Sequence, residues 1–473
     1  MEPLRTSSTW SSAPTDPRRV EPKLRRKYDV HGPRYTSYPP ANHFAPIDRD
    51  ELFGRWRSRN GIDPDPGLSL YVHIPFCESR CLYCGCHSFI CQDRSVAGTY
   101  VRAVLTEMDL AAQVVDPVRP VRQVALGGGT PNFLPVGTLR ALLAGIHARW
   151  QIRPDAERSC EIDPRSVTEE QLDVLLSRGF NRFSLGVQDF SPTVLELVSR
   201  RQSGLAVEHV VDYLRARGCQ ELNFDLIYGL PGQSLETAQL TVRRLLDLGP
   251  TRVALYSYAH VPWIRPHQEA LEERGLPSPE LKAEMFWFVA DALLAAGYRS
   301  IGMDHFALPS DPLYAALEDR TLRRSFMGYT IGRGLDVLGF GVSAISSVGA
   351  SYSQNDKDLE PYHQAVAGRS LPIVRGHLLS PDDELRRELL LELFCTFHAD
   401  LSSLSKRFGL DAATYLADDL ARLAPMIDDG LVSWTEQEIL VSPQGRFFIR
   451  NICMTFDRYL ERDGLERRYS RTV

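Results

Sequence analysis

The chain of 473 residues lacks several features that would place it at once in a class of proteins. It has no run of about 18 apolar residues that could cross a membrane, and its N-terminus has no apolar stretch typical of a secretory signal. Its net charge is -6, so it has no overall positive charge with which to bind nucleic acid. These absences favour a cytoplasmic protein that binds neither membrane nor nucleic acid, and the length predicts two or three domains.

The sequence also lacks an even, dispersed set of cysteines. It has nine, and five of them lie between residues 77 and 91. An odd, clustered set is not typical of a secreted disulfide framework. In a reducing compartment, such a cluster more often binds metal. The stretch CESRCLYCGC (77–86) holds four cysteines at C-x3-C-x2-C-x-C spacing.

Apolar β-rich runs alternate with amphipathic stretches through the middle of the chain. Most of these runs are apolar throughout, as parallel strands covered on both faces are. Helices are expected between them, for example at 97–115 and 137–150. The alternation predicts a parallel α/β fold. The expected strands are 68–76, 123–129, 158–163, 182–188, 222–230 and 253–259.

The two ends of the chain differ from this middle part. Residues 1–30 are rich in Ser, Thr, Pro and charge, and we expect a disordered tail there rather than a mitochondrial transit peptide. From about residue 380, helical patterns precede a strand, a turn and a helix, an order that resembles a small winged-helix unit. Because this unit has no concentrated basic helix, we interpret it as a structural or lid domain.

Clustered thiolates bind either zinc or an iron–sulfur cluster. Structural zinc usually takes two separated pairs of ligands, whereas these four cysteines share one loop. Three cysteines at C-x3-C-x2-C suit three corners of a [4Fe–4S] cube, whose fourth iron then stays open to a small ligand. Zinc remains an alternative at this point.

The C-x3-C-x2-C motif follows an apolar strand, and Tyr83 directly precedes its third cysteine. This pattern resembles the radical S-adenosylmethionine (SAM) superfamily, in which the open iron holds SAM. Further motifs, from about residue 28 to the C-terminus, resemble the oxygen-independent coproporphyrinogen III oxidase (dehydrogenase) family. They are the fourth cysteine, Cys86, and GPRYTSYPP (32–40), YVHIPFC (71–77), GGGTPNFL (127–134), FSLGVQDF (183–190), DLIYGLPGQ (225–233), YAHVP (258–262), GMDHFA (302–307) and RNICMTFDRYL (450–460).

The resemblance implies a partial (β/α)6 barrel over 68–350, an N-terminal segment over 31–67 that covers the site, and a mainly helical, winged-helix-like domain over 380–473. It implies oxidative decarboxylation of coproporphyrinogen III to protoporphyrinogen IX by SAM-derived 5′-deoxyadenosyl radicals, in anaerobic haem and porphyrin biosynthesis. The expected partners are this substrate and an electron donor such as flavodoxin or ferredoxin, and the expected state is a monomer. Two alternatives are a haem-binding chaperone of the same superfamily and a zinc-dependent regulator.

The resemblance also implies roles for individual residues. Cys77, Cys81 and Cys84 would ligate the cluster. The resemblance implies that Cys86 matters as well, but the sequence does not indicate what it does. Because two carboxyl groups are lost, we expect two SAM molecules. Tyr71, Gly128, Glu161 and Ile345 are assigned to the first. A second set is assigned to the other molecule: Tyr83, Gly129, Thr130, Gln188, Arg200, Asp225 and Ala259.

Read without the resemblance, several of these residues have ordinary explanations. The glycines before Thr130 could form a tight turn, Glu161 could cap a helix, and Ala259 and Ile345 could be core residues. Two further positions bear on the substrate. Arg34, beside Tyr35, could meet substrate carboxylates, and Met327 stands where the family usually has a glutamine in Phe-Gln-Gly-Tyr-Thr.

Overall fold

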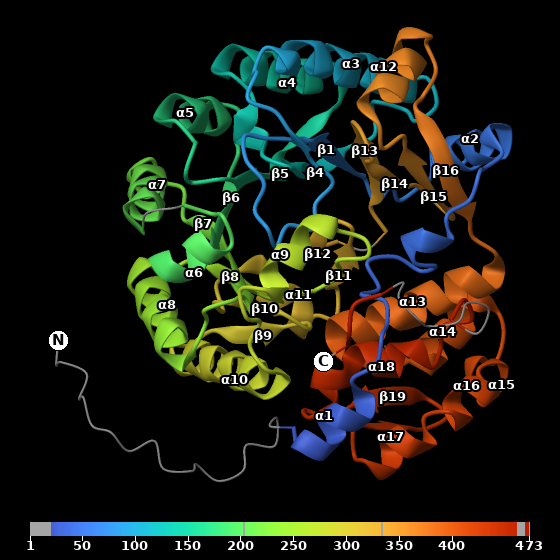
Figure 1. Cartoon of the computed structure of the whole chain (residues 1–473). Coiled ribbons are helices and arrows are strands. Elements are labelled where there is room, and N and C mark those ends of the chain that lie inside the picture. The colour runs from blue at the N-terminus through green and yellow to red at the C-terminus, as the bar shows by residue number, and fades with distance from the viewer. Residues whose placement is uncertain (1–19, 202–203, 333, 461–468, 473) are drawn as a thin grey trace.

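A twelve-stranded, strongly curved sheet forms the centre of the molecule (Figure 1). The computed structural model describes residues 20–201, 204–332, 334–460 and 469–472. Six neighbouring strands of the sheet run parallel. They are β1 (Leu68–Ile74), β4 (Val121–Gly128), β5 (Ile152–Ile162), β6 (Arg182–Gln188), β7 (Glu221–Tyr228) and β8 (Arg252–Ser257). These six correspond to the six expected strands, and the partial barrel is confirmed.

Helices cover the outer face of these strands and form an arc along the top and left of Figure 1. They are α3 (Val96–Ala111), α4 (Val136–Arg149), α5 (Glu169–Ser177), α6 (Pro192–Leu197), α7 (Gly204–Ala216), α8 (Leu235–Leu248) and α10 (Pro279–Ala295). Local sequence explains where some begin, because Thr168 and Ser234 form capping boxes at the starts of α5 and α8. Helix α8 ends at Gly249, whose φ of 52° favours glycine. The helices and strands share one large apolar core.

The inner face of the curved sheet is polar and partly filled by a hairpin. Arg252 and Arg182 both pair with Asp311, which is 1% exposed. The hairpin of β11 (Arg323–Ser325) and β12 (Gly328–Thr330) lies in the barrel, where Thr330 accepts a hydrogen bond from Gln123 of β4. The hairpin therefore fills part of the barrel near the amino ends of its strands.

The glycine-rich region extends the sheet, which the sequence pattern did not predict. Strand β13 (Asp336–Phe340) runs parallel to β1, with Leu68 opposite Asp336. The antiparallel strands β14 (Ile345–Ser347), β15 (Ser351–Asn355) and β16 (Ile373–Leu378) follow. At the other edge lie β10 (His305–Ala307) and β9 (Arg299–Ile301). Helices α9 (Glu269–Glu272), α11 (Pro312–Glu318) and α12 (Leu359–Ala367) lie in the connections.

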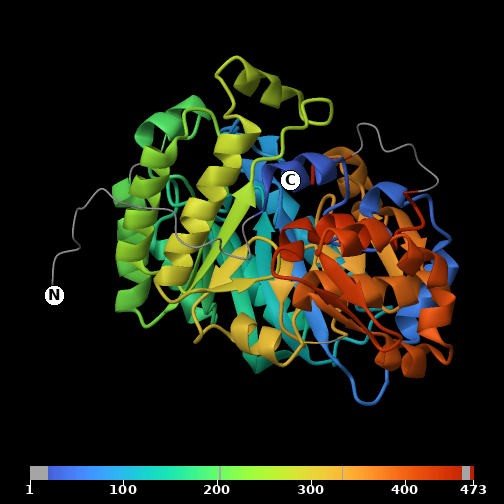
Figure 2. The ribbon, with the colours of Figure 1, turned by 90° about the horizontal axis from the view of Figure 1, so that it is seen from below.

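The C-terminal region has a core of its own beside the open side of the barrel (Figures 1 and 2). It begins with α13 (Pro381–Thr396), and its strands β17 (His398–Asp400), β18 (Val432–Trp434) and β19 (Glu438–Val441) form an antiparallel sheet in the order β17-β19-β18. Its other helices are α14 (Leu401–Phe408), α15 (Ala412–Tyr415), α16 (Ala417–Ala421), α17 (Ala424–Asp428) and α18 (Ile449–Met454). This order is consistent with the expected winged-helix-like domain.

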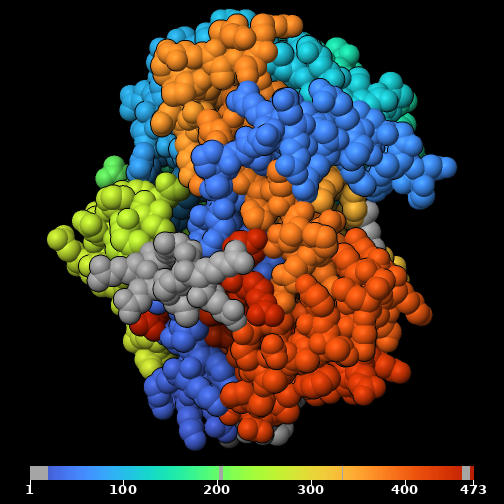
Figure 3. Space-filling model, turned by 90° about the vertical axis from the view of Figure 1, so that its right-hand side faces the viewer, coloured from blue at the N-terminus to red at the C-terminus, as the bar shows by residue number. Residues whose placement is uncertain are grey.

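The N-terminal segment runs between the barrel and the C-terminal domain (Figure 3). Residues 20–30, expected as part of a disordered tail, instead include α1 (Pro22–Tyr28), and α2 (Arg49–Arg57) follows. Tyr28 is buried against Phe448, with ring centroids 5.2 Å apart, which supplies the apolar contact that the composition did not suggest. Residues 1–19 of that prediction lie outside the described residues. No helix within the described ranges is long and apolar enough to cross a membrane.

Candidate functional site

The cysteine-rich loop lies beyond the carboxyl end of β1. It starts in β2 (Phe76–Cys77) and ends in β3 (Phe89–Ile90). These two strands pair with each other, so the two ends of the loop lie side by side. Cys77 Sγ lies 3.2 Å from Thr130 Oγ1, at the end of β4. Cys81 is buried, and its sulfur accepts a hydrogen bond of 3.6 Å from Arg200. The loop is thus fixed to the carboxyl edge of the barrel, where α/β barrels carry their sites.

Cys86 contacts the third cysteine of the motif. A hydrogen bond from the Cys86 thiol is the main cause that lowers the pKa of Cys84 to about 6. Burial, by contrast, raises the pKa of Cys77. The fourth cysteine therefore lies close enough to Cys84 to shift the pKa of its thiol, which the spacing alone did not reveal.

The geometry of the loop bears on which metal it could hold. In the part of the chain that the structure describes, no group of three or more His, Cys, Asp or Glu side chains is arranged to hold one metal ion. Zinc needs ligands that converge on one ion, whereas a [4Fe–4S] cube places each thiolate on a different iron. Three loop thiols, one beside a cation and one with a lowered pKa, fit the cube better than a zinc ion.

A segment after β8 fixes the backbone of the same loop, and sequence reasoning missed it. Gln268 donates to the Tyr83 carbonyl over 3.0 Å, and Arg265 donates to that of Gly85 over 2.7 Å. His267 Nε2 lies 2.9 Å from the Cys84 carbonyl oxygen. The YAHVP motif lies just before these residues, but no spacing rule connects them with the cysteines.

The glycines at the end of β4 are needed for close packing of protein groups. Gly128 has φ 112°, and a Cβ there would lie 2.5 Å from the His73 ring. A Cβ on Gly129 would lie 2.9 Å from the backbone of residues 75–76. The backbone N–H of Gly128 donates to Glu161 over 3.1 Å. A larger residue at either position would displace the strand that carries the loop.

Glu161 and Asp225 line a cavity of about 140 Å³ inside the barrel, together with Tyr71. Burial, and then the charge of Asp225, raises the pKa of Glu161 to about 7. Burial also raises the pKa of Asp225, although Ser184 and Asn223 donate to it over 2.8 and 2.9 Å. The two acids repel each other, so the part of the cavity that they line favours a positively charged group or hydroxyl groups.

Arg200 joins the loop to the neighbouring strands. It is 5% exposed and donates to Asp163 over 3.3 Å and to the carbonyl of Gly186. Gln188, at the end of β6, has φ 69°, and its side chain passes close to Gly186. Arg200 and Gln188 therefore lie on the cluster side of the barrel.

The other expected site residues lie around these two groups. Tyr83 packs with the buried cluster that includes Tyr258, and Ala259 directly follows Tyr258 after β8. Ile345 packs against the cluster that contains Phe44 and Tyr352 and does not line the carboxylate cavity. The structure thus brings Tyr71, Glu161 and Asp225 to one cavity. It places a second group around the loop, namely Tyr83, Thr130, Gln188 and Arg200.

Comparison with known proteins agrees with this arrangement. The family model "Radical SAM superfamily" matches residues 71–245, and the model "HemN C-terminal domain" matches residues 379–448. The chain is 40% identical to an oxygen-independent coproporphyrinogen III oxidase of Escherichia coli over 450 residues, 95% of this chain and 98% of that one. It is also 40% identical to the enzyme of that name from Pseudomonas aeruginosa over 465 residues, 96% and 99% of the two chains.

A solved structure of coproporphyrinogen III oxidase (HemN) from Escherichia coli, described as a radical SAM enzyme, matches with a TM-score of 0.87. The identity is 38%, and the match covers 94% of this chain and 100% of that one. The barrel and its cysteine loop define a radical SAM protein. Within that superfamily, the chain belongs to the family of oxygen-independent coproporphyrinogen III oxidases.

Proposed function

We propose that this protein converts coproporphyrinogen III to protoporphyrinogen IX by oxidative decarboxylation of two propionates. The observation that carries the proposal is that the cysteine loop lies at the carboxyl edge of a barrel whose cavity is lined by Glu161 and Asp225. When bound, the [4Fe–4S] cluster and SAM supply a 5′-deoxyadenosyl radical that takes a hydrogen atom from a substrate propionate. Cys77, Cys81 and Cys84 would hold the cluster.

The chain's own residues would then bind and orient SAM. Glu161 and Asp225 offer carboxylates to an ammonium group or to ribose hydroxyls. Arg200 donates a hydrogen bond to Cys81 Sγ, and its charge offers a partner to a SAM carboxylate. Residues 265–268 hold the loop backbone, so that the cysteines keep their positions while substrate enters and leaves.

We infer two SAM molecules, because two hydrogen atoms must be removed. The first would meet Tyr71, Gly128, Glu161 and Ile345. The second would meet Tyr83, Gly129, Thr130, Gln188, Arg200, Asp225 and Ala259. Equilibrium dialysis of labelled SAM against the reconstituted protein should give two equivalents at saturation, and Asp225→Ala should lose one. One equivalent that Asp225→Ala leaves unchanged would show sequential use of a single site.

Further parts of the proposal concern the whole protein rather than the site. We propose a flavodoxin-like or ferredoxin-like electron donor, a monomeric state, a cytoplasmic location, and domains over residues 31–67, 68–350 and 380–473.

Anaerobic incubation with coproporphyrinogen III, SAM and a reductant tests the proposed function. Protoporphyrinogen IX should form together with CO2. Retention of haem without release of CO2 would favour the chaperone alternative instead.

A further inference from the structure

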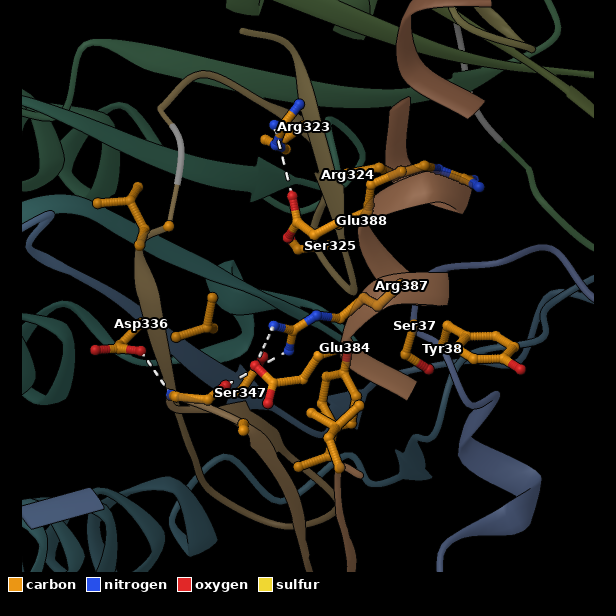
Figure 4. Close-up of a pocket in the computed structure, with 18 of the residues that line it drawn as sticks. Ser37, Tyr38, Arg323, Arg324, Ser325, Asp336, Ser347, Glu384, Arg387 and Glu388 are labelled. Atoms are coloured by element: carbon orange, nitrogen blue, oxygen red, sulfur yellow. Dashed lines mark hydrogen bonds and ion pairs between the residues drawn. The ribbon is translucent and has the colours of Figure 1, made fainter. Parts of the chain in front are cut away.

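A second cavity, of about 620 Å³, lies on the other side of the β11–β12 hairpin from the carboxylate cavity. Its size is typical of sites for small organic molecules and cofactors, which measure about 300–1,000 Å³. Its walls come from the N-terminal segment, the hairpin, β13 to β15 and α13 (Figure 4). The lining is both apolar and cationic, and it includes Tyr38, Phe326, Tyr352, Leu390 and several arginines.

Three side chains separate the two cavities, because Gln123, Met327 and Thr330 line both. Gln123 donates to Thr330 and so fixes one side of this partition. Met327, at the tip of the hairpin, is the flexible member, because a methionine side chain adapts easily to its surroundings. A group bound in the larger cavity could therefore extend an arm past Met327 toward Glu161 and Asp225.

Most acids that line the larger cavity already have arginine partners. Asp336 pairs with Arg59 over 2.9 Å, and Glu388 pairs with Arg407 over 2.8 Å. Arg387 has a hydrogen bond with Tyr352 but no close carboxylate partner. Its side chain is 16% exposed, and its contacts with Glu384 and with the Gly349 carbonyl are long, at 4.0 and 3.5 Å. Figure 4 shows Arg387 reaching from α13 across the cavity toward Ser347.

Arg324, on the hairpin, is a second cation with unused hydrogen-bonding capacity. It is 9% exposed, and its guanidinium lies 4.7 Å from the Phe394 ring centre and 5.2 Å from that of Tyr329. One nitrogen donates to the Arg34 carbonyl, but its Nε is buried with no hydrogen-bond partner among the described residues. A buried N–H without a partner is costly, so the Arg324 guanidinium as a whole favours a further anionic partner.

We propose that the larger cavity seats the macrocycle of the tetrapyrrole. Arg324 and Arg387 bind the propionates that the reaction leaves intact, and the propionate to be decarboxylated extends past Met327. The apolar walls cover the faces of the macrocycle. This inference rests on the proposed function, because it is the tetrapyrrole substrate that supplies both the large apolar body and the carboxylates.

The test uses coproporphyrin III, the stable oxidised macrocycle, in equilibrium dialysis against the anaerobically reconstituted full chain. An arginine–carboxylate pair is a strong, charge-assisted hydrogen bond. Arg387→Gln should therefore weaken binding about tenfold or more, and Arg387→Lys should restore part of the affinity. Arg140→Gln, on the outer helix α4, is the matched control and should bind as the wild type does. The fully esterified porphyrin should not distinguish Arg387→Gln from the wild type.

Equal affinity of Arg387→Gln and the wild type for coproporphyrin III would overturn this placement. Weakened binding by Arg34→Gln alone would also overturn it, because the Arg34 side chain instead lines a pocket beside α10. Thermal melting of each variant shows whether it is folded. Turnover of coproporphyrinogen III by the wild type is measured separately. If the wild type shows no turnover, the proposed function is contradicted. If the wild type turns over and Arg387→Gln binds coproporphyrin III as the wild type does, only the placement of the substrate is contradicted.

Discussion

Replacing Glu161 by glutamine should stabilise the protein when SAM is absent and weaken SAM binding. Folding raises the pKa of Glu161 from 4.5 to about 7, chiefly through burial and secondly through the charge of Asp225. A raised carboxyl pKa stabilises the fold below pH 4.5, and this stabilisation is lost as the pH rises toward 7. Glutamine still accepts the hydrogen bond from Gly128 but carries no charge.

The magnitude follows from the two pKa values. At pH 8 the full effect is at most about 3.4 kcal/mol, because each tenfold change in proton affinity corresponds to about 1.4 kcal/mol. The carboxylate lines a cavity that water enters, so screening reduces the effect, and we expect about 1 kcal/mol. Glu161→Gln should therefore melt about 1–3 °C above the wild type at pH 8 and close to it at pH 5.

Thermal unfolding of the SAM-free protein between pH 5 and pH 8 measures this difference, and dialysis with SAM measures the functional cost. We expect Glu161→Gln to lose about tenfold or more in affinity for SAM, because a charged hydrogen bond is lost. Asp225→Asn should change stability in the same direction, since it removes the other charge of the pair. If Glu161→Gln melts below the wild type at pH 8, the carboxylate is stabilised by the protein and our reasoning fails.

The remaining predictions concern the cluster and the partition between the cavities. Serine at any one of the three ligand cysteines should abolish the iron–sulfur absorption of the reconstituted protein. Cys91→Ser should retain it, and zinc without sulfide in the anaerobic protein would contradict the assignment. Met327→Gln should change the Michaelis constant or the rate measurably, because Met327 lines both cavities. Unchanged kinetics would show that Met327 only fills space.

The sequence predicted the six parallel strands because each is a long apolar run with helical patterns on either side. It did not predict β13 to β16, which are short, contain glycine and serine, and are buried through pairing rather than through an apolar pattern. Helix α1 was missed because Tyr28 is the one buried residue of the helix. Helices and strands that depend on such tertiary contacts cannot be predicted from the local composition of the sequence.

For the site, the cysteine spacing and the resemblance predicted the loop, and the structure adds that Cys86 lies beside Cys84. The structure also places Glu161 and Asp225 in one cavity. The sequence could not predict this proximity, because the two residues are 64 positions apart in the chain. The arginines of the larger cavity have no motif at all. Arg324 and Arg387 line the same cavity only because the hairpin and α13 both contribute to its wall.

Counting the products of one turnover tests the central claim most directly. The anaerobically reconstituted protein is incubated with coproporphyrinogen III, SAM and a chemical reductant, and CO2, 5′-deoxyadenosine and protoporphyrinogen IX are measured together. We predict two equivalents each of CO2 and 5′-deoxyadenosine for every protoporphyrinogen IX, and none of the three from Cys81→Ser. Formation of 5′-deoxyadenosine without CO2, with the tetrapyrrole recovered unchanged, would contradict the account.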